Sequence, residues 1–260
     1  MQLETLWNRV AKPGDQLAVA VPSYMSFDNL GLFLGIAAEL DIPVVAMVDA
    51  AIAATRREYA GAVPVHIDLS LRTAMLTRIA QDGNAQFERA VVVDEAGMLD
   101  LYDTWLRVIA EAFVQQSRFD PLHTANTEQA LQDSILDWLA IAATRKSVPM
   151  EIDYRGISHK AELDWIEFVS AATPVYQNIV SNLRALYRAG DMPALQLSDR
   201  AARMPGLADT LKARVGGEAF LLEPGATARG LAARCPEHRT GSSVSLVRHL
   251  PWDQSRIAVE

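Results

Sequence analysis

The first 62 residues alternate between runs of strand length and segments with helical spacing. Residues 16–22 and 42–48 are nearly continuous apolar runs. Residues 26–40 carry apolar side chains at helical spacing, and residues 49–61 form an alanine-rich helical segment that ends at a glycine. A strand–helix–strand–helix order in so short a stretch predicts two parallel strands joined by a right-handed crossover. We therefore expect an α/β fold.

Residues 63–94 change this pattern, because they contain three strand-like runs with no helix between them. The sequence QDGN at 81–84 is a strong hairpin signal between the second and third runs. The first run is almost wholly apolar, which is typical of a strand in the centre of a sheet. An antiparallel meander is expected here, within a mixed sheet that helices flank.

The remainder of the chain alternates between helix-like and strand-like segments. Ser158 is placed to cap a long helix that runs to about residue 189, and Pro174 should kink or divide it. Residues 241–252 resemble one more strand. The other expected helices cover 98–116, 127–146, 204–215 and 225–234, and the other expected strands cover 148–157, 194–199 and 219–223.

Composition excludes several classes of protein. The chain has 260 residues, half of them hydrophobic, and a formal net charge of −8. No cluster of Lys and Arg suggests nucleic-acid binding. A single cysteine, Cys235, excludes an internal disulfide and a cysteine-rich metal site. The N-terminus does not resemble a signal peptide, and no apolar stretch has the length of a membrane span, so we expect a cytoplasmic chain that does not bind membranes.

One polar break follows the first strand of the meander. Asp68 ends an apolar run, and Ser70 and Thr73 follow it. An acid in this position, followed by hydroxyl side chains, often marks a phosphate- or metal-binding turn. Such turns usually contain glycines, because backbone amides must approach the phosphate closely. This turn contains none, and Ser70, Leu71 and Arg72 occupy it.

The order of these segments and their junctions resembles the ATPase domain of DnaK-type heat-shock chaperones, which belongs to the actin-like superfamily. The resemblance covers roughly residues 5–235 and rests on several weak motifs in the right order. VHIDLSLRT stands where the family has DLGGGT, and LQLSDRAARMPGL stands where it has LVGGSSRIP. LEPGATARGLAAR is similar to the closing helix P-x-x-A-x-A-x-GAA.

The resemblance implies a ribonuclease-H-like lobe together with part of a first lobe. It divides the chain into a partial first lobe over 1–62, a second lobe over 63–239 and a C-terminal strand or tail over 240–260. The second lobe would include a helical insertion at about 98–147.

Departures from the family pattern fall on the nucleotide contacts. At the phosphate turn Asp68 and Thr73 remain, but the glycines are gone. On the helix that contacts adenine, Asp133 replaces a glutamate, and apolar side chains replace the lysine and serine. In the adenosine motif, Asp199 and Arg200 replace a glycine pair. These five residues are the remnant cleft positions. Losing several such contacts would weaken a micromolar binder beyond millimolar, so no cofactor is expected; the alternative is ATP with Mg²⁺.

Other functions of these residues stay open. Asp68 could cap its own turn or position a metal or water. Asp199 and Arg200 could pair with each other or with Asp68, and a plain loop is the alternative. Arg72 could bind an anion or lie in solvent. A third possibility is a hydrolase or transferase with a new site around Asp68, Asp199 and Arg200.

Most of the first lobe of the family, including its first phosphate turn, has no counterpart before residues 16–22. That strand or its neighbour would then have an unpaired apolar edge, which must be covered. The C-terminal strand, a protein partner or a second copy could cover it. The sequence thus favours a degenerate DnaK-like module for protein interaction or assembly over an enzyme; the alternative is an ATP-binding chaperone-like protein or a fragment of one.

Overall fold

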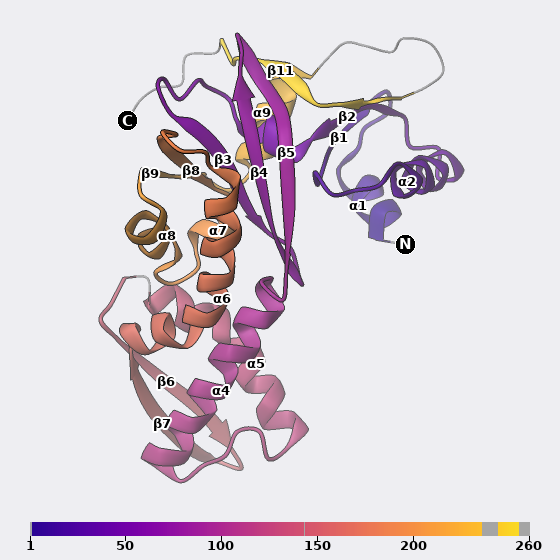
Figure 1. Cartoon of the computed structure of the whole chain (residues 1–260). Helices are drawn as coiled ribbons and strands as arrows, with labels where there is room; N and C mark the ends of the chain where they lie inside the picture. The colour runs from indigo at the N-terminus through magenta and orange to yellow at the C-terminus, as the bar shows by residue number, and fades with distance from the viewer. Residues whose placement is uncertain (1, 143, 236–243, 255–260) are drawn as a thin grey trace.

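Two β-sheets and a separate β-hairpin form the strands of this α/β protein, and helices flank the mixed sheet (Figure 1). The computed structural model describes residues 2–142, 144–235 and 244–254. Figure 1 shows both sheets in the upper part of the molecule and the hairpin with two long helices below them. The described strands run in the order β1-β2-β10 in the first sheet and β11-β5-β4-β3-β8-β9 in the second.

The first sheet contains the parallel pair expected from the first 62 residues. Its strands are β1 (Leu17–Val21), β2 (Val44–Asp49) and β10 (Leu246–Val247), and all pair in parallel. Leu17 and Val19 face α1 (Gln2–Val10) and α2 (Phe27–Glu39), whereas the alternate residues of β1 face the opposite side. The two faces differ because successive side chains of a strand point in opposite directions.

The second sheet contains the expected meander. Strands β3 (Val63–Leu69), β4 (Thr73–Gln81) and β5 (Asn84–Asp94) are antiparallel neighbours. On its other side β3 pairs in parallel with β8 (Pro193–Leu197), which pairs with β9 (Glu218–Leu221). The prediction of a central β3 is confirmed, since it has a neighbour on each side.

Below the sheets a single hydrophobic core joins the helical region to the second sheet. Trp105 in α4 is fully buried, and its indole Nε1 donates a hydrogen bond to the carbonyl of Phe168 in α6 at 2.9 Å. The elements of this region are α4 (Met98–Ser117), α5 (Ala125–Ala142), β6 (Ser147–Tyr154), β7 (Ile157–Asp164) and α6 (Trp165–Leu186). Four short helices complete the described chain: α3 (Ala50–Ala54), α7 (Asp199–Ala202), α8 (Leu207–Val215) and α9 (Ala226–Arg234).

Two predicted helices begin or end at other residues in the structure, and the first of them is the long helix predicted from Ser158. Ser158 lies in β7, and α6 begins after Asp164, whose backbone amide donates to Glu167 Oε2 at 2.8 Å. This pair forms a capping box, a stronger start signal than an isolated serine. Pro174 lies inside α6 without dividing it, because both halves of the helix pack against the same core.

The alanine-rich helix predicted over 49–61 ends at Ala54. The next residue, Thr55, bonds through its hydroxyl to the carbonyl of Ala51 at 2.8 Å and contacts Gln196 of β8 at 2.9 Å. Side chains that bond to nearby backbone compete with helix propagation. The chain then leaves the helical path and leads into β3.

The single C-terminal strand predicted over 241–252 is also wrong. Its first three residues lie outside the described residues, and the rest forms β10 in the first sheet and β11 (His249–Pro251) in the second. Arg248 separates the two strands, and its carbonyl accepts a hydrogen bond from the amide of Phe87 at 2.9 Å. This short segment therefore joins both sheets. The boundaries predicted at residues 62 and 240 stay predictions.

Candidate functional site

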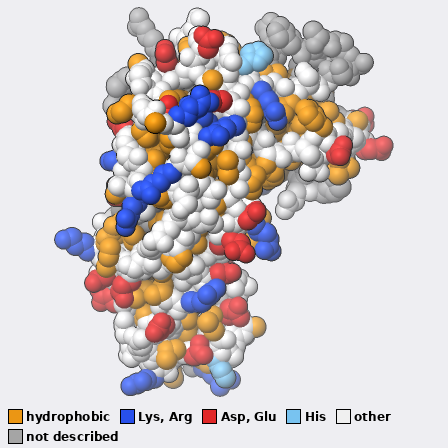
Figure 2. Space-filling model, in the orientation of Figure 1, with side chains coloured by type: hydrophobic (Ala, Val, Ile, Leu, Met, Phe, Trp, Pro, Cys, Tyr) orange, Lys and Arg blue, Asp and Glu red, His pale blue; other side chains and the backbone are white. Residues whose placement is uncertain are grey.

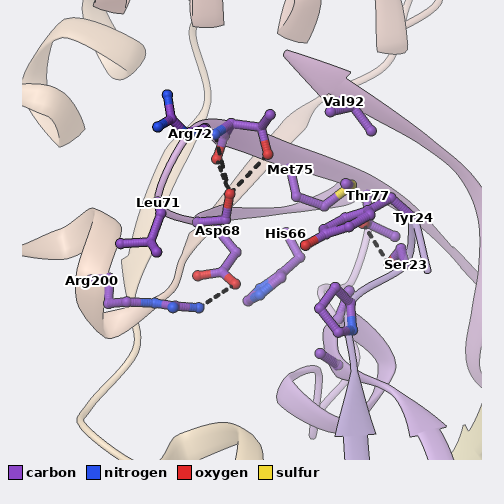
Figure 3. A pocket seen from close by; sticks show the side chains of 15 residues that line it. Ser23, Tyr24, His66, Asp68, Leu71, Arg72, Met75, Thr77, Val92 and Arg200 are labelled. Carbon is purple, nitrogen blue, oxygen red and sulfur yellow. Dashed lines mark hydrogen bonds and ion pairs between the residues drawn. The ribbon is translucent and has the colours of Figure 1, made fainter. Parts of the chain in front are cut away.

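Two pairs of parallel strands, β1–β2 and β3–β8, end at a common cavity between the two sheets, and Arg200 reaches it from the segment after β8. Parallel strands align their carboxyl ends, and loops that follow these ends form ligand crevices in open α/β sheets. Pro22 and Ser23 follow β1, Ala50 follows β2, and Asp68 lies near the end of β3. A cavity of about 610 Å³ opens between them (Figure 3). Its other lining residues include Tyr24, His66, Leu71, Arg72, Thr73, Met75, Thr77, Val92 and Arg200.

A second cavity of about 380 Å³ adjoins the first and extends along β1 toward α9. The two cavities share Pro22, Ala50, His66, Asp68 and Arg200, so we call them together the cleft.

Asp68 and Arg200 form an ion pair, with Arg200 Nη2 2.7 Å from Asp68 Oδ2. The parallel register of β3 and β8 explains it, because Ile67 lies opposite Leu197 and the following residues leave the sheet at the same level. The Asp68 side chain is 23% exposed and that of Arg200 is 50% exposed. Asp199 pairs instead with Arg203 at 3.2 Å, on the same helical stretch.

The turn between β3 and β4 is closed by its own hydroxyl groups. Ser70 Oγ lies 2.8 Å from Thr73 Oγ1 and accepts a hydrogen bond from the Thr73 amide at 3.1 Å. The carbonyls of Ser70 and Leu71 accept hydrogen bonds from the amides of Met98 and Leu99, each at 2.9 Å. The Thr73 hydroxyl is thus engaged within the turn. Since the first turn of α4 needs acceptors for its amides, the β3–β4 turn also acts as a cap for that helix.

A buried polar network lies behind the cleft. His66 Nδ1 is 2.9 Å from Gln196 Oε1, and Gln196 Nε2 donates to the Tyr59 hydroxyl at 2.8 Å. His66 is only 3% exposed. Burial lowers the pKa of its imidazole, although Asp68, Gln196 and Asp49 act in the opposite direction. His66 is therefore neutral at physiological pH, as expected for a core histidine.

Asp49 is fully buried at the end of β2. Its Oδ1 accepts hydrogen bonds from the amides of Ala51 and Ile52 at 2.9 and 3.3 Å, which caps α3. Its Oδ2 has no hydrogen-bond partner at bonding distance in the described chain. Burial raises the pKa of this carboxyl, while the nearby Ser23 hydroxyl and the two amides act to lower it. The Ser23 hydroxyl itself lies 3.0 Å from Thr77 Oγ1 on β4.

The neutral state of His66 predicts a loss of stability in mild acid. Its folded-state pKa is lower than the unfolded value near 6.5, so below that pH the unfolded chain binds a proton that the folded chain does not. The free energy of unfolding should fall by up to about 1.4 kcal/mol per pH unit. Chemical denaturation from pH 7.5 to 5 measures this slope. His66→Gln should flatten it; equal slopes for parent and His66→Gln would contradict the assignment.

The structure brings four of the five predicted cleft residues together. Asp68, Thr73, Asp199 and Arg200 line the cleft, and Asp68 Oδ1 accepts a hydrogen bond from the amide of the next residue, Leu69, at 3.0 Å. Asp133 does not join them; it is exposed on α5 and accepts a hydrogen bond from Gln129 at 2.7 Å.

The sequence did not single out Ser23 or Tyr24 as cleft residues. Both lie in the segment that follows β1. A polar residue shortly after an apolar parallel strand is the signal that could have found Ser23. Tyr24 gives no such signal, because aromatic residues are common in loops and cores alike.

The sequence matches no protein-family model and no curated protein. Among the residues that the structure describes, no helix is long and apolar enough to cross a membrane. The same residues contain no group of three or more His, Cys, Asp or Glu side chains that could hold a metal ion.

Proposed function

We propose that this chain is a degenerate DnaK-like, actin-like module that acts in protein interaction or assembly and does not hydrolyse ATP. The resemblance in the sequence implies a ribonuclease-H-like lobe. The second sheet supports this, because its antiparallel meander β3–β5 continues into the parallel strands β8 and β9. The position of the cleft, between that sheet and the parallel pair β1–β2, agrees with a two-lobed arrangement.

Loss of nucleotide binding follows from what occupies the cleft. Side chains replace the glycines at the β3–β4 turn, so backbone amides are no longer accessible to a phosphate from that side. The Thr73 hydroxyl bonds to Ser70 rather than facing a ligand. Arg200 extends from the position of the former glycine pair and bonds to Asp68 across the space that a nucleoside would need.

The observation that carries the interaction function is the outer edge of β1. In the described part of the chain β10 pairs with β2, and no strand pairs with the other side of β1. The helix α2, which packs on the face of this sheet that carries Leu17 and Val19, exposes apolar side chains: Phe27 is 78% exposed and Leu32 is 64% exposed. Figure 2 shows hydrophobic side chains gathered over the part of the surface that α1 and α2 form. An open strand edge and an exposed apolar surface each favour association with another chain.

A pair of proline substitutions tests the edge. The Leu17 amide donates to the Pro43 carbonyl toward β2, and successive amides of a strand alternate in direction. The Val19 amide should therefore point toward β2 and the Ala20 amide toward the open edge. Ala20→Pro should remove only the outward donor and abolish self-association, measured as mass against concentration by light scattering. Val19→Pro should instead lower the stability of the fold.

The light-scattering experiment tests a second copy of this chain as the partner. Two β1 edges related by a two-fold axis can pair antiparallel. A parent protein that stays monomeric at all concentrations would contradict the homodimer.

A rise of several degrees in the unfolding temperature with millimolar ATP–Mg²⁺ would contradict the loss of nucleotide binding and favour an ATP-binding chaperone-like protein.

A further inference from the structure

The larger cavity of the cleft has a polar end and an apolar end. Figure 3 shows Asp68 and Arg200 at one side and Met75, Tyr24 and Val92 at the other. Tyr24 is 49% exposed and Val92 is 42% exposed, so large apolar surfaces face solvent around the opening. A cavity of about 610 Å³ lies within the range that small organic ligands occupy.

At the polar end both oxygens of the Asp68 carboxylate already accept a hydrogen bond, whereas the Arg200 guanidinium has donors to spare. Asp68 Oδ1 accepts from the Leu69 amide, and Asp68 Oδ2 accepts from Arg200. A guanidinium has five N–H donors. In the described chain Arg200 uses only Nη2, for its bond to Asp68. The uncommitted donors of this cation fit an acceptor, preferably an anionic one.

We propose that the cleft binds a small monocarboxylate with an apolar body. The carboxylate would form a bidentate pair with Arg200, and the apolar body would lie against Tyr24, Met75 and Val92. A single guanidinium beside the negative charge of Asp68 suits one negative charge better than a polyphosphate. Arg72 does not add to the polar end, since its guanidinium points away from Asp68 in Figure 3. This site is independent of the β1 edge.

Two kinds of ligand carry a carboxylate on an apolar body: a free carboxylic acid, and an apolar peptide with its C-terminal carboxylate. We favour the free acid, because the cavity size fits a single small molecule. The probe is 3-phenylpropionate, with 3-phenylpropan-1-ol as the neutral match. A short peptide that ends in phenylalanine, with a free or an amidated C-terminus, tests the second source.

Calorimetric titration of the full chain should detect saturable binding of 3-phenylpropionate and at least tenfold weaker binding of the alcohol. Arg200→Gln should weaken acid binding about tenfold or more, since a charge-assisted bidentate contact is lost. Asp68→Asn should strengthen it several-fold, because the competing carboxylate charge is removed. Arg203→Gln is the matched control: Arg203 is also exposed but pairs with Asp199, and affinity should not change.

Equal affinity for acid and alcohol would overturn the proposal, as would unchanged affinity in Arg200→Gln or the absence of saturable binding. Because a folding defect could mimic the loss in Arg200→Gln, the gain in Asp68→Asn is the second measurement, and weaker binding there would also overturn it. Tighter binding of the free peptide than of 3-phenylpropionate, with none of the amidated form, would support the same chemistry and assign the source as a peptide C-terminus. If the protein is monomeric but still binds the acid, only the proposed homodimer is contradicted.

Discussion

Arg234→Met should lower the free energy of unfolding by about 4 kcal/mol, measured by urea denaturation. Arg234 lies at the end of α9 and is only 8% exposed. Each of its guanidinium nitrogens donates to backbone carbonyls, with Nε bonding to Gly230 at 3.0 Å. The other four acceptors are the carbonyls of Thr55 (2.8 Å), Pro251 (3.3 Å), Ile52 (3.3 Å) and Ala53 (2.6 Å).

These bonds join three separate parts of the chain. The carbonyls of Ile52 and Ala53 lie at the C-terminal end of α3, where a helix leaves its last carbonyls without internal partners. Pro251 belongs to the C-terminal segment that connects the two sheets. Burial lowers the pKa of Arg234 to about 10, which reflects the cost of placing the charge there. Methionine removes that cost but leaves several buried carbonyls without donors, and this second effect should dominate.

Arg229→Met is the matched control, because it removes the same group from the same helix. The Arg229 side chain is 50% exposed and pairs with Glu223, which is 65% exposed. An exposed pair of this kind contributes roughly 0–1 kcal/mol, so the free energy of unfolding should change little. A similar loss in both variants would show that the carbonyl bonds of Arg234 do not account for its effect.

Gly97→Ala should lower the free energy of unfolding by about 3 kcal/mol and displace the β3–β4 turn. Gly97 is the N-cap of α4, and a Cβ atom there would lie 2.4 to 2.5 Å from three backbone atoms of Arg72. Backbone cannot move aside as a flexible side chain can, so either the turn or the start of α4 must shift. The Met98 amide, which bonds to the Ser70 carbonyl, would lose that contact.

Gly31→Ala should have the opposite effect on the free energy of unfolding. Gly31 lies in the middle of α2, and a Cβ atom there would have no atom within 4 Å. Alanine should raise stability by roughly 0.5–1 kcal/mol, because it restricts the unfolded chain. Thermal denaturation of both variants compares the two effects. A stable Gly97→Ala variant with an unchanged 3-phenylpropionate affinity would contradict the close packing at Arg72.

Local patterns predicted the framework of the fold well. The apolar runs of β1 and β2 with a helix between them gave a parallel pair, and the QDGN turn gave the hairpin between β4 and β5. Residues close in sequence decide these features, through backbone preferences and side-chain alternation. The start of α6 was misplaced because a short strand and a helix start both contain polar residues at irregular spacing, and Ser158 was only one of several possible caps.

Of the cleft, the sequence by itself determined that Asp68, Thr73, Asp199 and Arg200 lie at or near the ends of strand-like runs, and that the turn after Asp68 contains no glycine. Only the tertiary structure decided that Arg200 pairs with Asp68, that Asp133 lies apart, and that residues 244–254 join both sheets. The reason is physical. Alternation and helical spacing act over a few residues, whereas the contacts of Arg200 and Arg234 join positions more than a hundred residues apart in the chain, where the register of packed strands sets the distance.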